Sequence, residues 1–187
     1  INKLLRLLPE NEFVNRLAPT LTDISHILRS RDLEAREQTR RTFSTILRLV
    51  GPTYLNFMLK ELRSALQRGY QLHVLSYTVH YLLVTNADQG DLDACLDEFI
   101  AVIMDDIFGV TGQEKEAEDY TASMKEIKSS KSYDTTEILA RSASIKHLGQ
   151  LMMPIRTLLS ERLDSKMVKK IDDLLVRVRK GVDQNPA

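Results

Sequence analysis

Residues 51–83 read GPTYLNFMLKELRSALQRGYQLHVLSYTVHYLL, and the pattern of this stretch decides the fold. The apolar residues of its first half recur at helical spacing and make one continuous face: Tyr54, Leu55, Met58, Leu59, Leu62, Ala65 and Leu66. Polar residues occupy the opposite side, which predicts a helix from about 53 to 68 that packs on one face. Gly51-Pro52 and Gly69 bound it, because glycine accepts the left-handed cap conformation and proline cannot continue a helix. A second helix is predicted at about residues 71–85.

This helix pair recurs along the chain. A shift of 38 positions carries Leu17 onto Leu55, and a further shift of 37 carries Leu55 onto Leu92. The stripes related in this way are Leu17, Leu21, Ile24 and Leu28, then Leu55, Leu59, Leu62 and Leu66, then Leu92, Leu96, Phe99 and Ile103. The second helices repeat at a shift of 36, from Thr39, Phe43, Ile46 and Leu47 to Leu75, Val79, Leu82 and Leu83. Helix pairs with this period are typical of HEAT and armadillo-like arrays.

We therefore predict an all-α fold, a HEAT/armadillo-like α-solenoid of about four helix pairs with a charged loop insertion in the third. One pair cannot cover its apolar face alone and must stack on the next. The repeats are expected at about residues 10–50, 53–87, 91–147 and 148–181 of one solenoid spanning 1–187, with the insertion at 109–133. Because the chain begins at Ile1 rather than Met, we interpret it as a piece of a longer protein.

Several local features refine this prediction. The insertion is polar and charged, which predicts a mobile loop with at most transient helix. Asp134 and Glu137, three residues apart, resemble a capping box at the start of the next helix. Gly181 is expected to end the last helix, and Pro19 and Pro154 are expected inside helices as kinks.

The composition excludes several classes of function. Lys plus Arg and Asp plus Glu total 26 each, so a global basic field for nucleic acid or anionic membranes is absent. No apolar run approaches the roughly 20 residues of a membrane span. The single cysteine, Cys95, cannot form an internal disulfide and is predicted to be a core residue. No Gly-rich phosphate cradle, GxSxG, HExxH or CxxC motif occurs, so we predict no enzyme, no catalytic residue, no metal and no cofactor.

Two other groups of residues could form a functional site, but packing or solvation explains them better. His73 and His80 lie two helical turns apart, roughly 10 Å, which is too far to share a metal. We interpret them as packing between helices, with a stacking surface for RNA or a peptide as the alternative. Asp105 and Asp106, and the acidic residues 114–119, are interpreted as solvated charges rather than as a metal site or paired acids.

Six basic residues are candidate contacts to a partner or to RNA: Lys60, Arg63, Arg68, Lys125, Lys128 and Lys131. The first three give an exposed edge to the helix at about 53–68. The last three make a basic, hydroxyl-rich end to the insertion, suited to phosphate or to phosphorylation of its serines. Ordinary solvent exposure and a solubilising linker are the alternatives.

Three stretches carry a resemblance to a known family. They are RGYQLHVLSYTVH at residues 68–80, SSKSYDTTEILA at 129–140 directly after the charged insertion, and residues 176–186. Together they resemble the family of the U-three small nucleolar RNA-associated protein twenty (the down-regulated in metastasis protein), the large HEAT-repeat component of the small-subunit processome. The thirteen contiguous residues at 68–80 are far more specific than a repeat pattern.

The resemblance implies a nucleolar, non-catalytic scaffold of the 90S pre-ribosome that supports pre-rRNA processing, 18S rRNA maturation and ribosome biogenesis. Its implied partners are pre-ribosomal proteins and pre-rRNA or small nucleolar RNA, with no membrane, small-molecule substrate or cofactor. The alternative is a HEAT-repeat transport receptor or regulatory-subunit scaffold that binds peptides or proteins.

Overall fold

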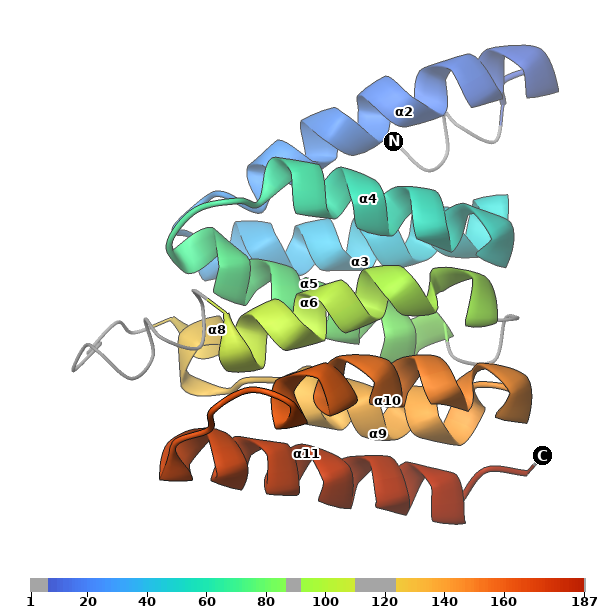
Figure 1. Cartoon of the computed structure of the whole chain (residues 1–187). Helices are drawn as coiled ribbons and strands as arrows, with labels where there is room; N and C mark the ends of the chain where they lie inside the picture. The colour runs from blue at the N-terminus through green and yellow to red at the C-terminus, as the bar shows by residue number, and fades with distance from the viewer. Residues whose placement is uncertain (1–6, 87–91, 110–123, 187) are drawn as a thin grey trace. The chain divides into compact units, whose positions relative to one another are not determined.

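The computed structural model describes residues 7–86, 92–109 and 124–186, and the regular elements in these ranges are all helical (Figure 1). The predicted all-α fold is confirmed for this part of the chain. The chain divides into two compact units, Ile1–Gly90 and Asp91–Ala187. Each unit is built from antiparallel helix pairs in the layered manner of a solenoid.

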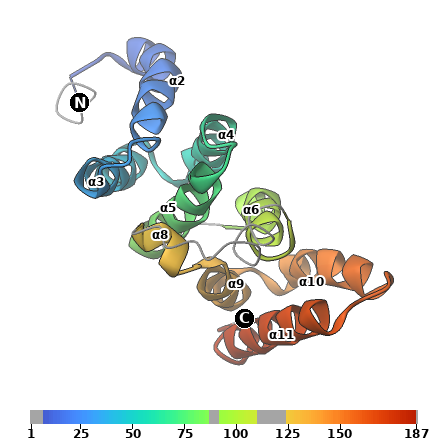
Figure 2. The same ribbon diagram turned by 90° about the vertical axis from the view of Figure 1, so that its left-hand side faces the viewer.

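The first unit holds two helix pairs, α2 (Glu10–Ile27) with α3 (Leu33–Val50) and α4 (Leu55–Ala65) with α5 (Tyr70–Asn86). A short 3₁₀ turn, η1 (Pro52–Tyr54), leads into α4. α2 packs on α4 and α3 packs on α5, so the first helices form one layer and the second helices another (Figure 2).

The second unit repeats this scheme after the 3₁₀ turn η3 (Asp93–Cys95). Its first pair is α6 (Leu96–Phe108) with α9 (Ser132–Ser142). α10 (Ile145–Leu159) then packs on α6, and α11 (Ser165–Asp183) packs on α9. The second-helix layer, α9 against α11, is the more extensive of the two contacts.

Burial follows the repeat pattern read from the sequence. All twelve residues of the three first-helix stripes, from Leu17 to Ile103, are at most 6 % exposed. The two second-helix stripes, including Thr39, are equally buried. Cys95 is 3 % exposed, which confirms it as a core residue. Gly51 ends α3 with φ +92, a conformation that favours glycine.

The structure differs from the sequence-based expectations at the charged insertion. Residues 110–123 lie outside the described residues. After this gap, helical structure begins earlier in the sequence than expected. Lys125–Lys128 form the short helix α8, and α9 already begins at Ser132. Glu126 is only 1 % exposed, so this end of the insertion is packed and is not a free linker.

Two serines attach this segment to α6 through Asp106. Its Oδ2 accepts hydrogen bonds from Ser130 Oγ (2.8 Å) and Ser132 Oγ (2.5 Å). Asp106 is 3 % exposed, so its interpretation as a solvated charge is wrong. The acidic residues 114–119 lie outside the described residues.

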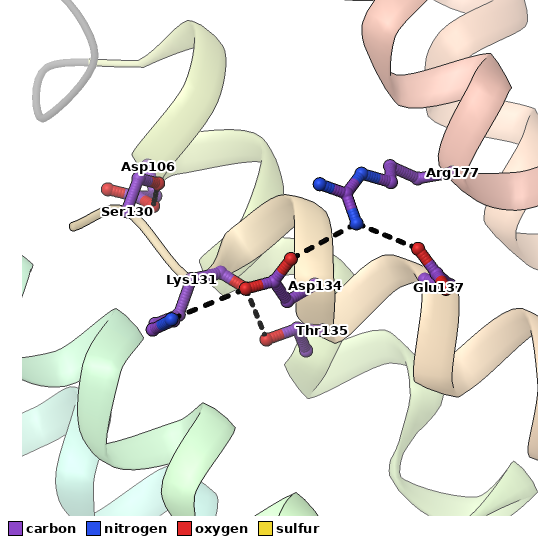
Figure 3. Close-up of polar contacts among 7 residues, drawn as sticks. All are labelled: Asp106, Ser130, Lys131, Asp134, Thr135, Glu137 and Arg177. Atoms are coloured by element: carbon purple, nitrogen blue, oxygen red, sulfur yellow. Dashed lines mark hydrogen bonds and ion pairs between the residues drawn. The ribbon is translucent and has the colours of Figure 1, made fainter.

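Asp134 and Glu137 do not form a capping box, because α9 starts two residues before Asp134 and both side chains face α11. Arg177 Nη1 donates to Glu137 Oε2 at 2.8 Å and pairs with Asp134 Oδ1 at 3.2 Å (Figure 3). The hydrogen bond to Glu137 raises the pKa of Arg177 further above its ordinary value, against the opposing effect of burial. The charge of Arg177 therefore links two carboxylates of α9 to α11.

Gly181 does not end α11, which continues to Asp183. It is buried against α9, and a Cβ at this position would lie 2.6 Å from Ala140 Cβ and overlap the Glu137 carbonyl oxygen. Glycine is required here for the close approach of two helices and not for a turn.

Four helices have their C-terminal carbonyls bonded by a side chain from another element of the same unit. Arg29 Nε donates to Ala65 O of α4 (2.9 Å) and Arg48 Nη2 to Thr85 O of α5 (2.7 Å). Lys170 Nζ donates to Ile107 O of α6 (3.0 Å). Asn185 Nδ2 donates to Ala140 O and Ala143 O at the end of α9, both at 2.9 Å. The three cations also match the negative end of a helix dipole.

The contact at Gly181 generates a stability prediction. Replacing a helical glycine by alanine ordinarily stabilises a helix by about 1 kcal/mol. We expect Gly181→Ala to destabilise the protein instead, by about 1–3 kcal/mol, because α9 must move away from the added methyl group. Urea unfolding followed by circular dichroism measures the difference.

The matched control is Gly149→Ala. Gly149 also lies inside a helix, α10, and nothing approaches within 4 Å of an added Cβ. This variant should be as stable as the parent or more so. Equal stabilisation by the two substitutions would contradict the close-packed contact.

Candidate interaction surfaces

Three of the six predicted contact residues belong to the first unit. Lys60 and Arg63 are exposed on α4, and Arg68 is exposed in the turn that joins α4 to α5. Arg63 lies in the last turn of α4, so it and Arg68 both lie near the end of the helix pair. Lys60 lies farther back along α4.

The other three belong to the second unit and differ among themselves. Lys125 and Lys128 are exposed on α8. Lys131 directly precedes α9, and its Nζ lies 3.4 Å from Asp134 Oδ2 (Figure 3). Lys131 therefore also has a structural role at the start of α9. The six residues form two separate groups, one in each unit.

The end of the first unit carries more positive charge than the sequence indicated. The α2–α3 turn lies against the α4–α5 turn: Arg29 Nε donates to Ala65 O, and Tyr70 Oη donates to Arg29 O. The Arg31 guanidinium lies 5.9 Å from the centre of the Tyr70 ring. Two further arginines, Arg29 and Arg31, thus lie against the α4–α5 turn that contains Arg68.

We call the exposed residues Arg29, Arg31, Arg63 and Arg68 the arginine edge. The two segments that form it, 28–32 and 63–70, contain these four arginines and one acidic residue, Asp32. Both carboxylate oxygens of Asp32 accept backbone N–H groups, from Glu34 and Ala35, at the start of α3. Asp32 is therefore occupied as a helix cap.

Arg29 and Arg31 are not among the six residues predicted from the sequence. The repeat spacing could have indicated them. The shift of 38 positions that relates Leu28 to Leu66 also relates residues 29–31 to residues 67–69 of the next repeat. Turns at equivalent places in consecutive repeats lie at the same edge of a stack. Charges in both turns therefore belong to one surface.

Of the histidines and tyrosines of α5, His73 is buried, and Tyr70, Tyr77, His80 and Tyr81 are half-buried. His73 is 4 % exposed, which confirms its interpretation as a packing residue. Tyr77 lies under the guanidinium of Arg40, 4.8 Å from Cζ to the ring centre, and Arg40 Nε donates to Thr78 Oγ1 at 3.2 Å. Arg40 is 1 % exposed, so this polar group connects α3 to α5 and is not a binding surface.

A Ser–His–Asp group occurs where η3 meets the start of α10. Asp93 Oδ2 lies 2.9 Å from His147 Nδ1, and Ser144 Oγ lies 2.8 Å from the same nitrogen. In a catalytic triad the serine and the aspartate bind opposite ring nitrogens. Here both bind Nδ1, and Asp93 Oδ1 also accepts the Ser144 backbone N–H (3.0 Å). The group is a helix cap.

In residues 7–86, 92–109 and 124–186, no three His, Cys, Asp or Glu side chains are placed so as to hold a metal ion. No helix there has the length and apolar character that crossing a membrane requires.

Comparison with known proteins identifies the family. The model of the U3 small nucleolar RNA-associated protein 20 domain matches residues 1–187. The chain belongs to this family. It is 46 % identical over 188 residues to U3 small nucleolar RNA-associated protein 20 of Schizosaccharomyces pombe and 41 % identical over 181 residues to that of Saccharomyces cerevisiae. These alignments cover 99 % and 95 % of the chain but only 8 % and 7 % of the two relatives.

The segments that resemble the U3 small nucleolar RNA-associated protein 20 family have defined places in the fold. Residues 68–80 comprise the α4–α5 turn with Arg68 and the first half of α5. Residues 129–140 and 176–186 form most of α9 and the end of α11, and these two helices pack together through Gly181. The arginine edge therefore adjoins one of these segments, and the other two make one helix contact.

The cap on α10 generates a pH prediction for this family member. Burial opposes ionisation of Asp93, but hydrogen bonds from Ser144 and the nearby His147 outweigh it and hold its pKa below the ordinary 3.8. A carboxyl with a lowered folded-state pKa contributes stability at neutral pH that is lost as the pH falls through that pKa. We expect Asp93→Asn to be less stable than the parent at pH 7, and the gap to close as the pH falls below about 4. Denaturant unfolding at a series of pH values measures it.

The control for this prediction is Asp172→Asn, at an exposed position in the middle of α11. It should change stability little at pH 7. A gap between Asp93→Asn and the parent that stays constant down to pH 2 would refute an ionised cap.

Proposed function

We propose that this chain is a segment of a non-catalytic helical-repeat scaffold in the small-subunit processome, the 90S pre-ribosome. In this role it supports pre-rRNA processing and 18S rRNA maturation. The observation that carries the proposal is the family match over residues 1–187, together with relatives named for association with U3 small nucleolar RNA. The chain spans less than a tenth of those relatives, so the whole protein's role extends to this segment only as part of the proposal.

The layered helices support a structural role. Stacked helix pairs expose long outer surfaces and helix ends while the apolar stripes are used for stacking. In the described residues the Ser–His–Asp group serves as a helix cap, and Arg40 joins two helices. These two polar groups thus hold helices together, which supports a structural role.

The outer surface of α10 supports a role in protein contacts. Four of its large apolar side chains are exposed: Ile145, Met152, Met153 and Leu159, at 64 %, 38 %, 66 % and 55 %. Exposed apolar groups that gather on one element typically mark an interaction surface. Methionine side chains are flexible enough to fit several neighbours. We propose that α10 is covered in the assembled particle.

The same reasoning gives the location and the partners. A processome scaffold acts in the nucleolus, among pre-ribosomal proteins, pre-rRNA and small nucleolar RNA. We propose these as the partners of the parent protein, with no membrane and no small-molecule substrate.

The proposal is tested by depletion and rescue of the parent protein. Depletion should lower 18S rRNA and leave the large-subunit rRNA unchanged, as measured by pulse labelling and northern blotting. Rescue with the full-length parent protein should restore 18S rRNA. Rescue with Gly181→Leu should be impaired, because the larger side chain separates α9 from α11. Gly149→Ala should rescue fully.

Affinity purification of the full-length protein separates the proposal from a transport receptor or a regulatory subunit. Recovery of pre-rRNA and nucleolar proteins supports the proposal. Unchanged 18S rRNA after effective depletion, or recovery of import cargo or phosphatase subunits instead, refutes it.

A further inference from the structure

We propose that the arginine edge of the first unit binds the phosphate groups of RNA, with Arg31 and Arg68 beside Tyr70 as its main contacts. This inference rests on the proposed function and names the ligand class and the residues. The edge consists of exposed side chains in two adjacent turns, so a nucleic-acid strand reaches it without any opening of the helix stack.

The first step of the argument is that the edge is held in place. Arg29 Nε is bonded to Ala65 O at the end of α4, and Tyr70 Oη to Arg29 O. The α2–α3 turn is also held from inside, where the buried Arg36 donates from Nη1 to Ser30 O at 3.0 Å. Side chains on a fixed backbone lose less conformational entropy when they bind a ligand.

The second step concerns charge. The chain as a whole has equal numbers of acidic and basic residues. Segments 28–32 and 63–70, by contrast, contain four arginines and one acidic residue, Asp32. Asp32 is engaged by the N-terminus of α3, so its carboxylate faces backbone N–H groups. Within these two segments arginines outnumber acidic residues, although Glu34 and Glu61 lie just outside them in the sequence, and a positive patch attracts a polyanion.

The third step is the type of group. Arginine presents a planar fork of donors that matches the oxygens of a phosphate, and the Ala65 carbonyl takes one of the five N–H groups of Arg29. Tyr70 adds an aromatic ring beside Arg31, the combination used to stack unpaired bases. Arginines next to an aromatic ring favour single-stranded RNA over a simple ion.

An acidic protein segment is the competing ligand. Ile27 and Leu33 flank the α2–α3 turn and are 46 % and 41 % exposed, which would suit an apolar contact. RNA is favoured because the Tyr70 ring lies beside Arg31 and because both curated relatives are named for association with a small nucleolar RNA. The experiment includes both ligands.

The test measures binding of the 187-residue chain to a fluorescein-labelled single-stranded RNA of mixed sequence by fluorescence anisotropy over a salt series. The variant Arg31→Glu/Arg68→Glu leaves the Arg29 bond to Ala65 intact. We expect it to weaken binding by about tenfold or more at low salt and to lower the slope of log K against log salt by about 1.4, for two lost single-strand phosphate contacts. Circular dichroism confirms that it folds.

The matched control is Arg16→Glu/Arg41→Glu, which makes the same change of charge at exposed positions on α2 and α3, outside the arginine edge. It should bind RNA nearly as well as the parent. Equal loss in both variants would show attraction by net charge alone and overturn the proposal. No binding by the parent, or efficient competition by a polyglutamate peptide but not by unlabelled RNA, would also overturn it.

These outcomes are separate from those that test the proposed function. If the full-length protein carrying Arg31→Glu/Arg68→Glu restores 18S rRNA while the isolated chain never binds RNA, only the RNA inference fails. If depletion leaves 18S rRNA unchanged, the processome role fails whatever the chain binds.

Discussion

The structure depends on one constraint: a pair of amphipathic helices has an apolar face that its two members cannot cover between them. Within each unit, apolar residues at equivalent positions of the two helix pairs meet this constraint by packing on each other. Their burial is nearly complete, with Leu21, Leu59 and Leu96 all at 0 % exposure. Layering in each unit, and the placement of polar groups at turns and helix ends, follow from it.

The repeat could be predicted because it depends on spacing alone. Leu17 and Leu55 are related by a fixed shift whatever surrounds them, and both are buried. The first repeat was predicted to end at about residue 50, where α3 ends, since Gly51-Pro52 is an unambiguous stop signal. Helix starts were less certain where a 3₁₀ turn precedes the helix, as at Pro52–Tyr54 and Asp93–Cys95.

Pairwise tertiary contacts could not be predicted, because each needs two segments that lie far apart in the chain. Gly181 resembles a helix stop until α9 is placed beside it. Asp134 resembles a helix cap in the sequence, but in the fold it pairs with Arg177, which lies 43 residues later in the chain. The arginine edge has the same origin, since Arg29 contacts Ala65 and Tyr70 only when the two turns are brought together. Repeat spacing indicates which turns and helices lie side by side, but it does not indicate which of their side chains are in contact.

The side chains that bond the helix C-termini have a mechanical consequence. Arg29, Arg48, Lys170 and Asn185 each donate to carbonyls at the C-terminal end of a helix in the neighbouring helix pair of the same unit. If two neighbouring helices slid lengthwise past each other by one turn, about 5.4 Å, these donors would lose their acceptors. The leucine faces alone would tolerate such a slip, since one apolar ridge resembles the next. Each unit therefore resists shear along its helix axes, and a pull on the chain in that direction is transmitted across the unit instead of being absorbed within it.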